Sequence, residues 1–228
     1  MACIRQMNGT FAREAFSMKY EQWRNELFSF PPESDPVMHE HAQDFYNVPP
    51  ELAFDYVDQI LVDSDVHGSF TKDQLGKGIN TIYSNCCSDL PFLYTSDCGE
   101  DRRVKGIRNL KHLYQNFFNR HCTGQVTDIG NSRDDGPMGF ICYMFWDVFV
   151  LYPGNATPGM VDAAIDVMHS VLQTNHDNSL VSAIHGLGHW ASSVPDAVSI
   201  LEHWCQKPTT QNHAVLEYAR AASTGMIQ

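Results

Sequence analysis

Two histidines one helical turn apart are the residues whose spacing best suits metal chemistry. His185 and His189 belong to the segment Ser-Ala-Ile-His-Gly-Leu-Gly-His-Trp, residues 182 to 190. Side chains four residues apart share one face of a helix, so two imidazoles there can bind one ion. The segment lacks the glutamate that follows the first histidine in zinc metalloproteases, and the sequence fixes no third ligand. The pair therefore predicts a zinc site, or imidazoles hydrogen-bonded where helices meet, or a partner surface.

A second candidate site contains oxygen ligands in residues 63 to 74. Asp63, Asp65 and Thr71 occupy positions 1, 3 and 9 of a loop with glycine at position 6, and apolar helical patterns flank it. The segment resembles an EF-hand calcium loop, and the resemblance implies calcium ligands at Asp63, Asp65, Thr71 and Gln74. It departs from the family because His67 stands at position 5 and Gln74 replaces the bidentate glutamate at position 12. A metal-free helix-loop-helix is the alternative.

An acidic segment is a third candidate for a functional surface. No lysine or arginine occurs between Asn25 and Thr71, where acidic residues are frequent. Glu51, Asp55 and Asp58 are spaced so that they share one face of a helix. This face predicts either a contact with a basic protein partner or an ordinary solvated surface.

Composition narrows the classes of function. The 27 acidic and 15 basic residues give a net charge of −12, which argues against a nucleic-acid or anionic-membrane binder. The seven cysteines include no Cys-x-x-Cys pair and are expected to be reduced. No signal peptide or membrane span is predicted, so the expected location is cytoplasmic. No cofactor is expected, apart from the calcium or zinc that the candidate sites would take.

Helical periodicity recurs along the chain and would position these residues. Apolar stripes predict helices over 16–30, 51–62, 100–121 and 161–174, among others. Residues 138–152 are nearly all apolar, interrupted by Asp147, and are predicted to form a buried helix. The turn-rich segment 124–137 is the predicted boundary between an N-terminal half (1–123) and a C-terminal half (138–228) of one all-α domain spanning 1–228.

The C-terminal helices show a repeat. Helices predicted to begin at Pro158 and Pro195 start thirty-seven residues apart, each with a valine three residues later. Residues 158–223 resemble the HEAT and armadillo helical-repeat families. The resemblance implies antiparallel helix pairs in a bundle or a short α-α superhelix that presents a surface to another protein. It carries over no catalytic residue.

The function predicted first is a non-enzymatic, cytosolic protein-interaction module with an acidic surface. No phosphate-binding loop, nucleophile elbow or dinucleotide-binding glycine pattern occurs in the chain. The alternatives are a calcium-responsive EF-hand-like protein and a metal-dependent enzyme that uses His185 and His189. The sequence leaves the oligomeric state and the identity of the partner open.

Overall fold

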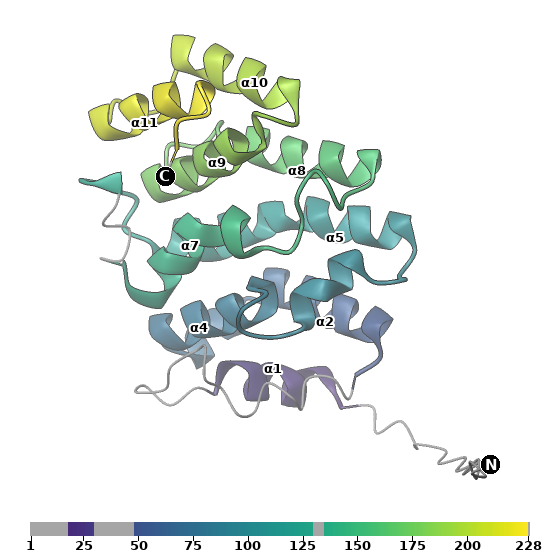
Figure 1. Ribbon diagram of the computed structural model, residues 1–228. Coiled ribbons are helices and arrows are strands. Elements are labelled where there is room, and N and C mark those ends of the chain that lie inside the picture. Colours follow the sequence, from purple (N-terminus) through teal and green to yellow (C-terminus); the bar gives the residue numbers. More distant parts are fainter. Residues whose placement is uncertain (1–17, 30–47, 130–134, 228) are drawn as a thin grey trace, which may run out of the picture.

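The computed structural model describes residues 18–29, 48–129 and 135–227, which form an all-α fold (Figure 1). No strand occurs in these ranges, so the predicted fold class is confirmed. In chain order, the elements are α1 (Tyr20–Phe28), α2 (Pro50–Val62), α3 (Val66–Ser69), α4 (Lys72–Tyr83), the 3₁₀ helix η3 (Leu90–Thr95), α5 (Glu100–Leu113), the π-helical turn η4 (Tyr114–Phe118), α6 (Asn119–His121), α7 (Gly136–Val148), α8 (Pro158–Val171), α9 (Asp177–Trp190), α10 (Pro195–Gln206) and α11 (His213–Ser223).

The long helices are stacked in tiers that form two columns (Figure 1). In one column α4, α7, α9 and α11 each pack against the next, and in the other α2 packs on α5 and α5 on α8. The α1 helix packs against α4 and closes one end. The thirty-seven-residue spacing in the sequence corresponds to two successive helix pairs, α8 with α9 and α10 with α11, at the other end.

Local sequence signals explain where the helices begin. Proline occupies the first turn of α2, α7, α8 and α10, where its missing N–H group costs no hydrogen bond. The Thr71 side chain caps α4 by accepting from Gln74 N, and the Gln74 side chain accepts from Thr71 N. The Asn212 side chain caps α11. These short-range interactions favour helix starts at these positions through local sequence alone.

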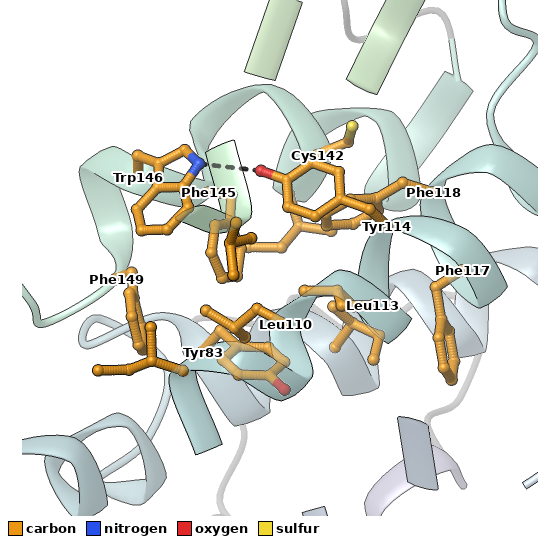
Figure 2. Packing of buried hydrophobic residues seen from close by; sticks show 14 of the residues in the cluster. Tyr83, Leu110, Leu113, Tyr114, Phe117, Phe118, Cys142, Phe145, Trp146 and Phe149 are labelled. Carbon is orange, nitrogen blue, oxygen red and sulfur yellow. Dashed lines mark hydrogen bonds between the residues drawn. The ribbon is translucent and has the colours of Figure 1, made fainter. Parts of the chain in front are cut away.

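The buried helix predicted over 138–152 is α7, and the apolar residues 149–151 that follow it are also buried. Its own aromatic side chains pack in the core (Figure 2): Phe145 lies against Tyr83 of α4 and against Trp146. Trp146 Nε1 donates to Tyr114 Oη at 2.9 Å (Figure 2). Tyr114 Oη in turn forms a hydrogen bond of 2.9 Å with Ser182 Oγ. This chain of hydrogen bonds connects η4, α7 and α9 inside the core.

The segment predicted to separate the two halves is held to both of them. Of that segment, residues 130–134 lie outside the described residues, as do Phe16 and Phe30 of the stripe predicted over 16–30. Asp135 accepts from Lys72 Nζ of the N-terminal half at 2.9 Å, and Gly124 N donates to Asn178 Oδ1 of the C-terminal half at 3.0 Å. One buried apolar cluster extends from Tyr20 to Ala222 through both halves. Along the described ranges, no helix has both the length and the apolar character required to cross a bilayer.

We expect acid to destabilise the fold through His121. Its Nε2 lies 2.9 Å from His67 Nδ1. Burial, together with His67, Arg120 and Lys72, lowers the pKa of His121 to about 4. The unfolded chain takes up this proton near the ordinary histidine pKa of about 6.5, so it binds more protons than the folded state between these values. The free energy of unfolding, measured by urea titration, should therefore fall as pH drops from about 6.5 to about 4.

Two substitutions test whether His121 causes this acid sensitivity. His121→Gln removes the titrating group and should make the free energy of unfolding depend less steeply on pH over that range. His213→Gln is the matched control, because the His213 side chain is 78% exposed and should leave the slope unchanged. An unchanged slope in His121→Gln would show that other groups cause the acid sensitivity.

Candidate metal centre

The two histidines singled out by their spacing face a carboxylate from another helix. His185 and His189 lie one turn apart in α9, and Asp147 lies in the last turn of α7. Asp147 Oδ2 is 2.7 Å from His185 Nε2, and Asp147 Oδ1 is 2.7 Å from His189 Nε2. The two Nε2 atoms are 3.0 Å apart. Within the described part of the chain, these residues form the one group of three or more His, Cys, Asp or Glu side chains with donor atoms within 4.8 Å of one another.

Hydrogen bonds alone cannot satisfy all three contacts. Each imidazole nitrogen has one direction in the ring plane, and along it carries either a hydrogen or a lone pair. If both Nε2 atoms donate to Asp147, two N–H groups lie side by side with their nitrogens only 3.0 Å apart, an unfavourable contact that no hydrogen bond offsets. If one Nε2 instead donates to the other, the accepting lone pair also faces a carboxylate oxygen. A cation held by both lone pairs and the carboxylate would satisfy every donor atom.

The separations also indicate a coordination geometry. For metal–ligand bonds of about 2.1 Å, two ligand atoms lie about 3.0 Å apart at a right angle and about 3.4 Å apart at the tetrahedral angle. The observed distances of 2.7, 2.7 and 3.0 Å lie nearer the right-angle value than the tetrahedral one. Two histidines and one carboxylate on one face of a six-coordinate ion form a set that leaves positions open for other ligands.

The centre is buried on one side and open on the other. The His185 side chain is 1% exposed, whereas those of Asp147 and His189 are 25% and 39% exposed. Burial opposes ionisation of Asp147, but the hydrogen bond and charge of His185 and the charge of His189 hold its pKa below the ordinary value. Burial also lowers the pKa of His189. An ionised carboxylate and a neutral imidazole are the forms that bind metal.

A tyrosine orients the buried histidine. Tyr218 Oη of α11 is hydrogen-bonded to His185 Nδ1. Burial raises the pKa of Tyr218, and its hydrogen bond with Tyr143 raises it further, so the hydroxyl stays protonated. Because the Tyr218 hydrogen can go to Tyr143, its oxygen can accept from His185 Nδ1–H. This tautomer leaves the His185 Nε2 lone pair directed at the centre, the arrangement usual for metal-binding histidines.

The glycines between the histidines let neighbouring helices come close. A Cβ atom on Gly186 would lie 2.5 Å from the Trp146 ring and 2.7 Å from Met168 Sδ. A Cβ on Gly188 would lie 2.8 Å from Ile227 Cδ1. Both glycines are therefore points where neighbouring segments approach α9 closely. Because Trp146 precedes Asp147, the contact at Gly186 also sets the position of the carboxylate.

Sequence reasoning missed two residues of this centre. In the sequence Asp147 stands out only as an interruption of an apolar segment. A lone carboxylate in a buried helix needs a charged or hydrogen-bonding partner, however, and that need is an available signal. Tyr218 gave no signal, because a half-buried tyrosine in an amphipathic helix is ordinary.

The residues of the predicted calcium loop have other partners. Asp63 Oδ2 accepts from Tyr20 Oη at 2.6 Å and from Arg24 Nη1 at 2.9 Å. Asp63 Oδ1 accepts from the backbone N of Asp65 at 3.0 Å. Thr71 and Gln74 form the capping box of α4, and the short helix α3 lies between Asp65 and Thr71. Calcium binding here stays a prediction, and it would require these oxygens to exchange their present hydrogen bonds for an ion.

The predicted acidic contact face is partly neutralised within the fold. Arg102 Nη2 of α5 lies 3.1 Å from Asp55 Oδ1 and 3.0 Å from Asp58 Oδ2, and its guanidinium lies 4.5 Å from the Phe54 ring centroid. Glu51 is exposed. The partner role of this face stays a prediction, and replacing its three carboxylates together would also remove both partners of Arg102.

Comparisons with known proteins give no relative. A scan against models of protein families found no match, and neither the curated proteins nor the solved structures contained one. The resemblances to EF-hand loops and to HEAT or armadillo repeats therefore stay predictions.

Gly186→Ala should destabilise the protein, because its Cβ would overlap Trp146 and Met168. Overpacking of this kind costs about 1–3 kcal/mol, measurable as a lower free energy of unfolding in urea. Gly68→Ala in α3 is the matched control: its Cβ would meet nothing within 4 Å, so the change should be neutral or stabilising by up to about 1 kcal/mol. Equal stability of Gly186→Ala and the parent chain would contradict the close contact.

Proposed function

We propose that the protein binds one divalent first-row transition metal ion through Asp147, His185 Nε2 and His189 Nε2, and that it uses the open positions of this ion for chemistry on an exogenous ligand. One observation carries the proposal: three donor atoms from two helices converge at distances of 2.7, 2.7 and 3.0 Å that no arrangement of hydrogens satisfies. This develops the metal-dependent enzyme that the sequence offers as an alternative.

The charge of the centre favours a water or anionic ligand. A divalent ion with two neutral imidazoles and one carboxylate carries a net charge of about +1. The exposed side formed by Asp147 and His189 is where such a ligand would enter. A bound ion of this kind can lower the pKa of a coordinated water toward about 7 or polarise an oxygen of a substrate. Metal-assisted hydrolysis is the reaction class that fits these features most directly.

The ligand set also indicates which ions to test. Imidazoles suit zinc, copper, iron and nickel, whereas carboxylates also suit manganese and magnesium. Donor atoms nearer the right-angle spacing than the tetrahedral one favour six-coordinate ions such as Fe²⁺, Mn²⁺, Co²⁺ or Ni²⁺ over the tetrahedral geometry usual for Zn²⁺. Zinc at His185 and His189 stays a prediction, with Asp147 as its third ligand.

The first test is metal binding by the full chain. Chelator-treated protein should bind about one ion per chain from Mn²⁺, Co²⁺, Ni²⁺ or Zn²⁺ in equilibrium dialysis. At 100 times the dissociation constant the bound ion should stabilise the fold by about 2.7 kcal/mol. For a chain of this length that corresponds to a rise in melting temperature of roughly 5–10 °C.

Variants assign the binding to this centre. His189→Ala and Asp147→Asn should abolish the metal-dependent rise in melting temperature, while His213→Ala, an exposed histidine away from the centre, should retain it. A weak visible spectrum of the Co²⁺ form would indicate six-coordination, and an intense one would indicate a tetrahedral site. Binding that survives both His189→Ala and Asp147→Asn, or no stoichiometric binding of any of these ions, would overturn the proposal.

Tyr218→Phe tests the orienting hydrogen bond. Loss of a partner that orients a metal-binding histidine typically costs about 10–100-fold in affinity, so the dissociation constant should rise by that factor. The ring and its packing are retained, so the melting temperature of the metal-free protein should change much less than the affinity. Tyr152→Phe is the control, because the exposed Tyr152 lies outside the centre. Unchanged affinity in Tyr218→Phe would show that Tyr218 does not hold the His185 tautomer.

A protein-interaction role is the second candidate, and it does not exclude the first. The observation that favours it is a groove between α8 and α10 at the end of the stack. The acidic face of α2 supports it less well, because Arg102 already pairs with two of its carboxylates.

A further inference from the structure

One column of the stack is open between its last two helices. In this column α2 packs on α5 and α5 packs on α8. The next two helices, α8 and α10, are both described along their whole length and make no comparable contact with each other. Both contact α9 instead. Between them lies a groove with a volume of about 750 Å³. Figure 1 shows α8 and α10 in the last two tiers of the molecule.

The groove has an apolar floor. Ile165 of α8 and Ile200 of α10 are half-buried, and Trp204 of α10 is buried. Trp204 Nε1 donates to Leu172 O at 2.9 Å, which holds the indole in place. The floor is therefore fixed before any ligand arrives, so binding would require little ordering of these side chains.

The rims of the groove are polar and carry separated charges. Asp166 and Asp196 contribute carboxylates, and Lys207 lies just past the end of α10. His169 and His203 are exposed, one on each rim. Two carboxylates and one ammonium in a chain of net charge −12 favour a ligand that carries positive charge.

We propose that this groove binds an amphipathic helix of a basic partner protein. The apolar stripe of that helix would pack on Ile165, Ile200 and Trp204, and a lysine or arginine beside the stripe would pair with Asp166 or Asp196. A helix fits because the space lies between two helix surfaces, and elsewhere in the same column the corresponding surface of one helix is covered by the next helix. Helices recognised in this way present apolar residues at helical spacing.

This inference is independent of the metal centre. The groove residues come from α8, α10 and the residues just after them, whereas the ligands come from α7 and α9. Failure of metal binding would leave the groove proposal intact, and failure of peptide binding would leave the metal proposal intact.

The experiment selects ligands from a displayed library of randomised helical peptides, with the full chain as target. Enriched peptides should share apolar positions at i, i+3, i+4 and i+7 and a net positive charge.

The binding of these peptides should weaken at least about tenfold in Ile200→Arg, which places a charge on the floor of the groove. Ser199→Trp, a change at an exposed position of the rim, should block the groove without altering the core. Asp166→Asn combined with Asp196→Asn should slow association more than it speeds dissociation.

Val62→Arg is the matched control, because Val62 is a 58% exposed apolar residue of α2 and lies outside the groove. It should leave peptide binding unchanged. Circular dichroism of each variant establishes that it folds. The proposal is overturned if no peptide is enriched, if the enriched peptides bind Ile200→Arg and Ser199→Trp as tightly as the parent chain, or if they lack helical periodicity. It is also overturned if the chain is a dimer that Ser199→Trp dissociates, because the occupant is then a second copy.

Discussion

The contact between α7 and α9 is the constraint on which the rest of the structure depends. Gly186 lets the Trp146 ring lie against α9, closer than any larger residue would allow. The same indole donates to Tyr114, whose hydroxyl reaches back to Ser182 of α9, so apolar packing and buried hydrogen bonds fix one register between these helices. Because α7 also packs on α4, and α9 on α11, this register is transmitted along the column.

The same register brings a carboxylate to two imidazoles at the edge of the core. Asp147 follows Trp146 directly, so its position follows from the contact just described. Partial burial would make an isolated carboxylate costly there, and His185 and His189 offset that cost. Tyr218 of α11 is hydrogen-bonded to the other ring nitrogen of His185, Nδ1, while Nε2 faces the carboxylate. Three successive helices of one column thus build the centre, and its open side lies where His189 reaches the surface.

The second column has a different role at this end of the molecule. Its helices α5 and α8 pack together closely, whereas α8 and α10 lie apart with a groove between them. The difference arises because α10 is held by α9 and α11 and not by α8. The two proposed sites therefore use different columns of the same helix stack. The metal centre depends on the close approach of α7 and α9, whereas the groove exists because α8 and α10 lie apart.

The sequence alone determined the helices and part of the site. Apolar periodicity, prolines in first turns and the Thr71 cap are local signals, so the predicted all-α fold and the shared face of His185 and His189 followed from them. Tertiary structure decided which charges meet. Asp147 lies 38 residues before His185 and reaches it only because α7 packs on α9. In the same way Arg24 binds Asp63 of the predicted calcium loop, and Arg102 neutralises part of the predicted acidic face. Helical spacing fixes neighbours within one turn, whereas partners across helices depend on the packing register, which no local pattern encodes.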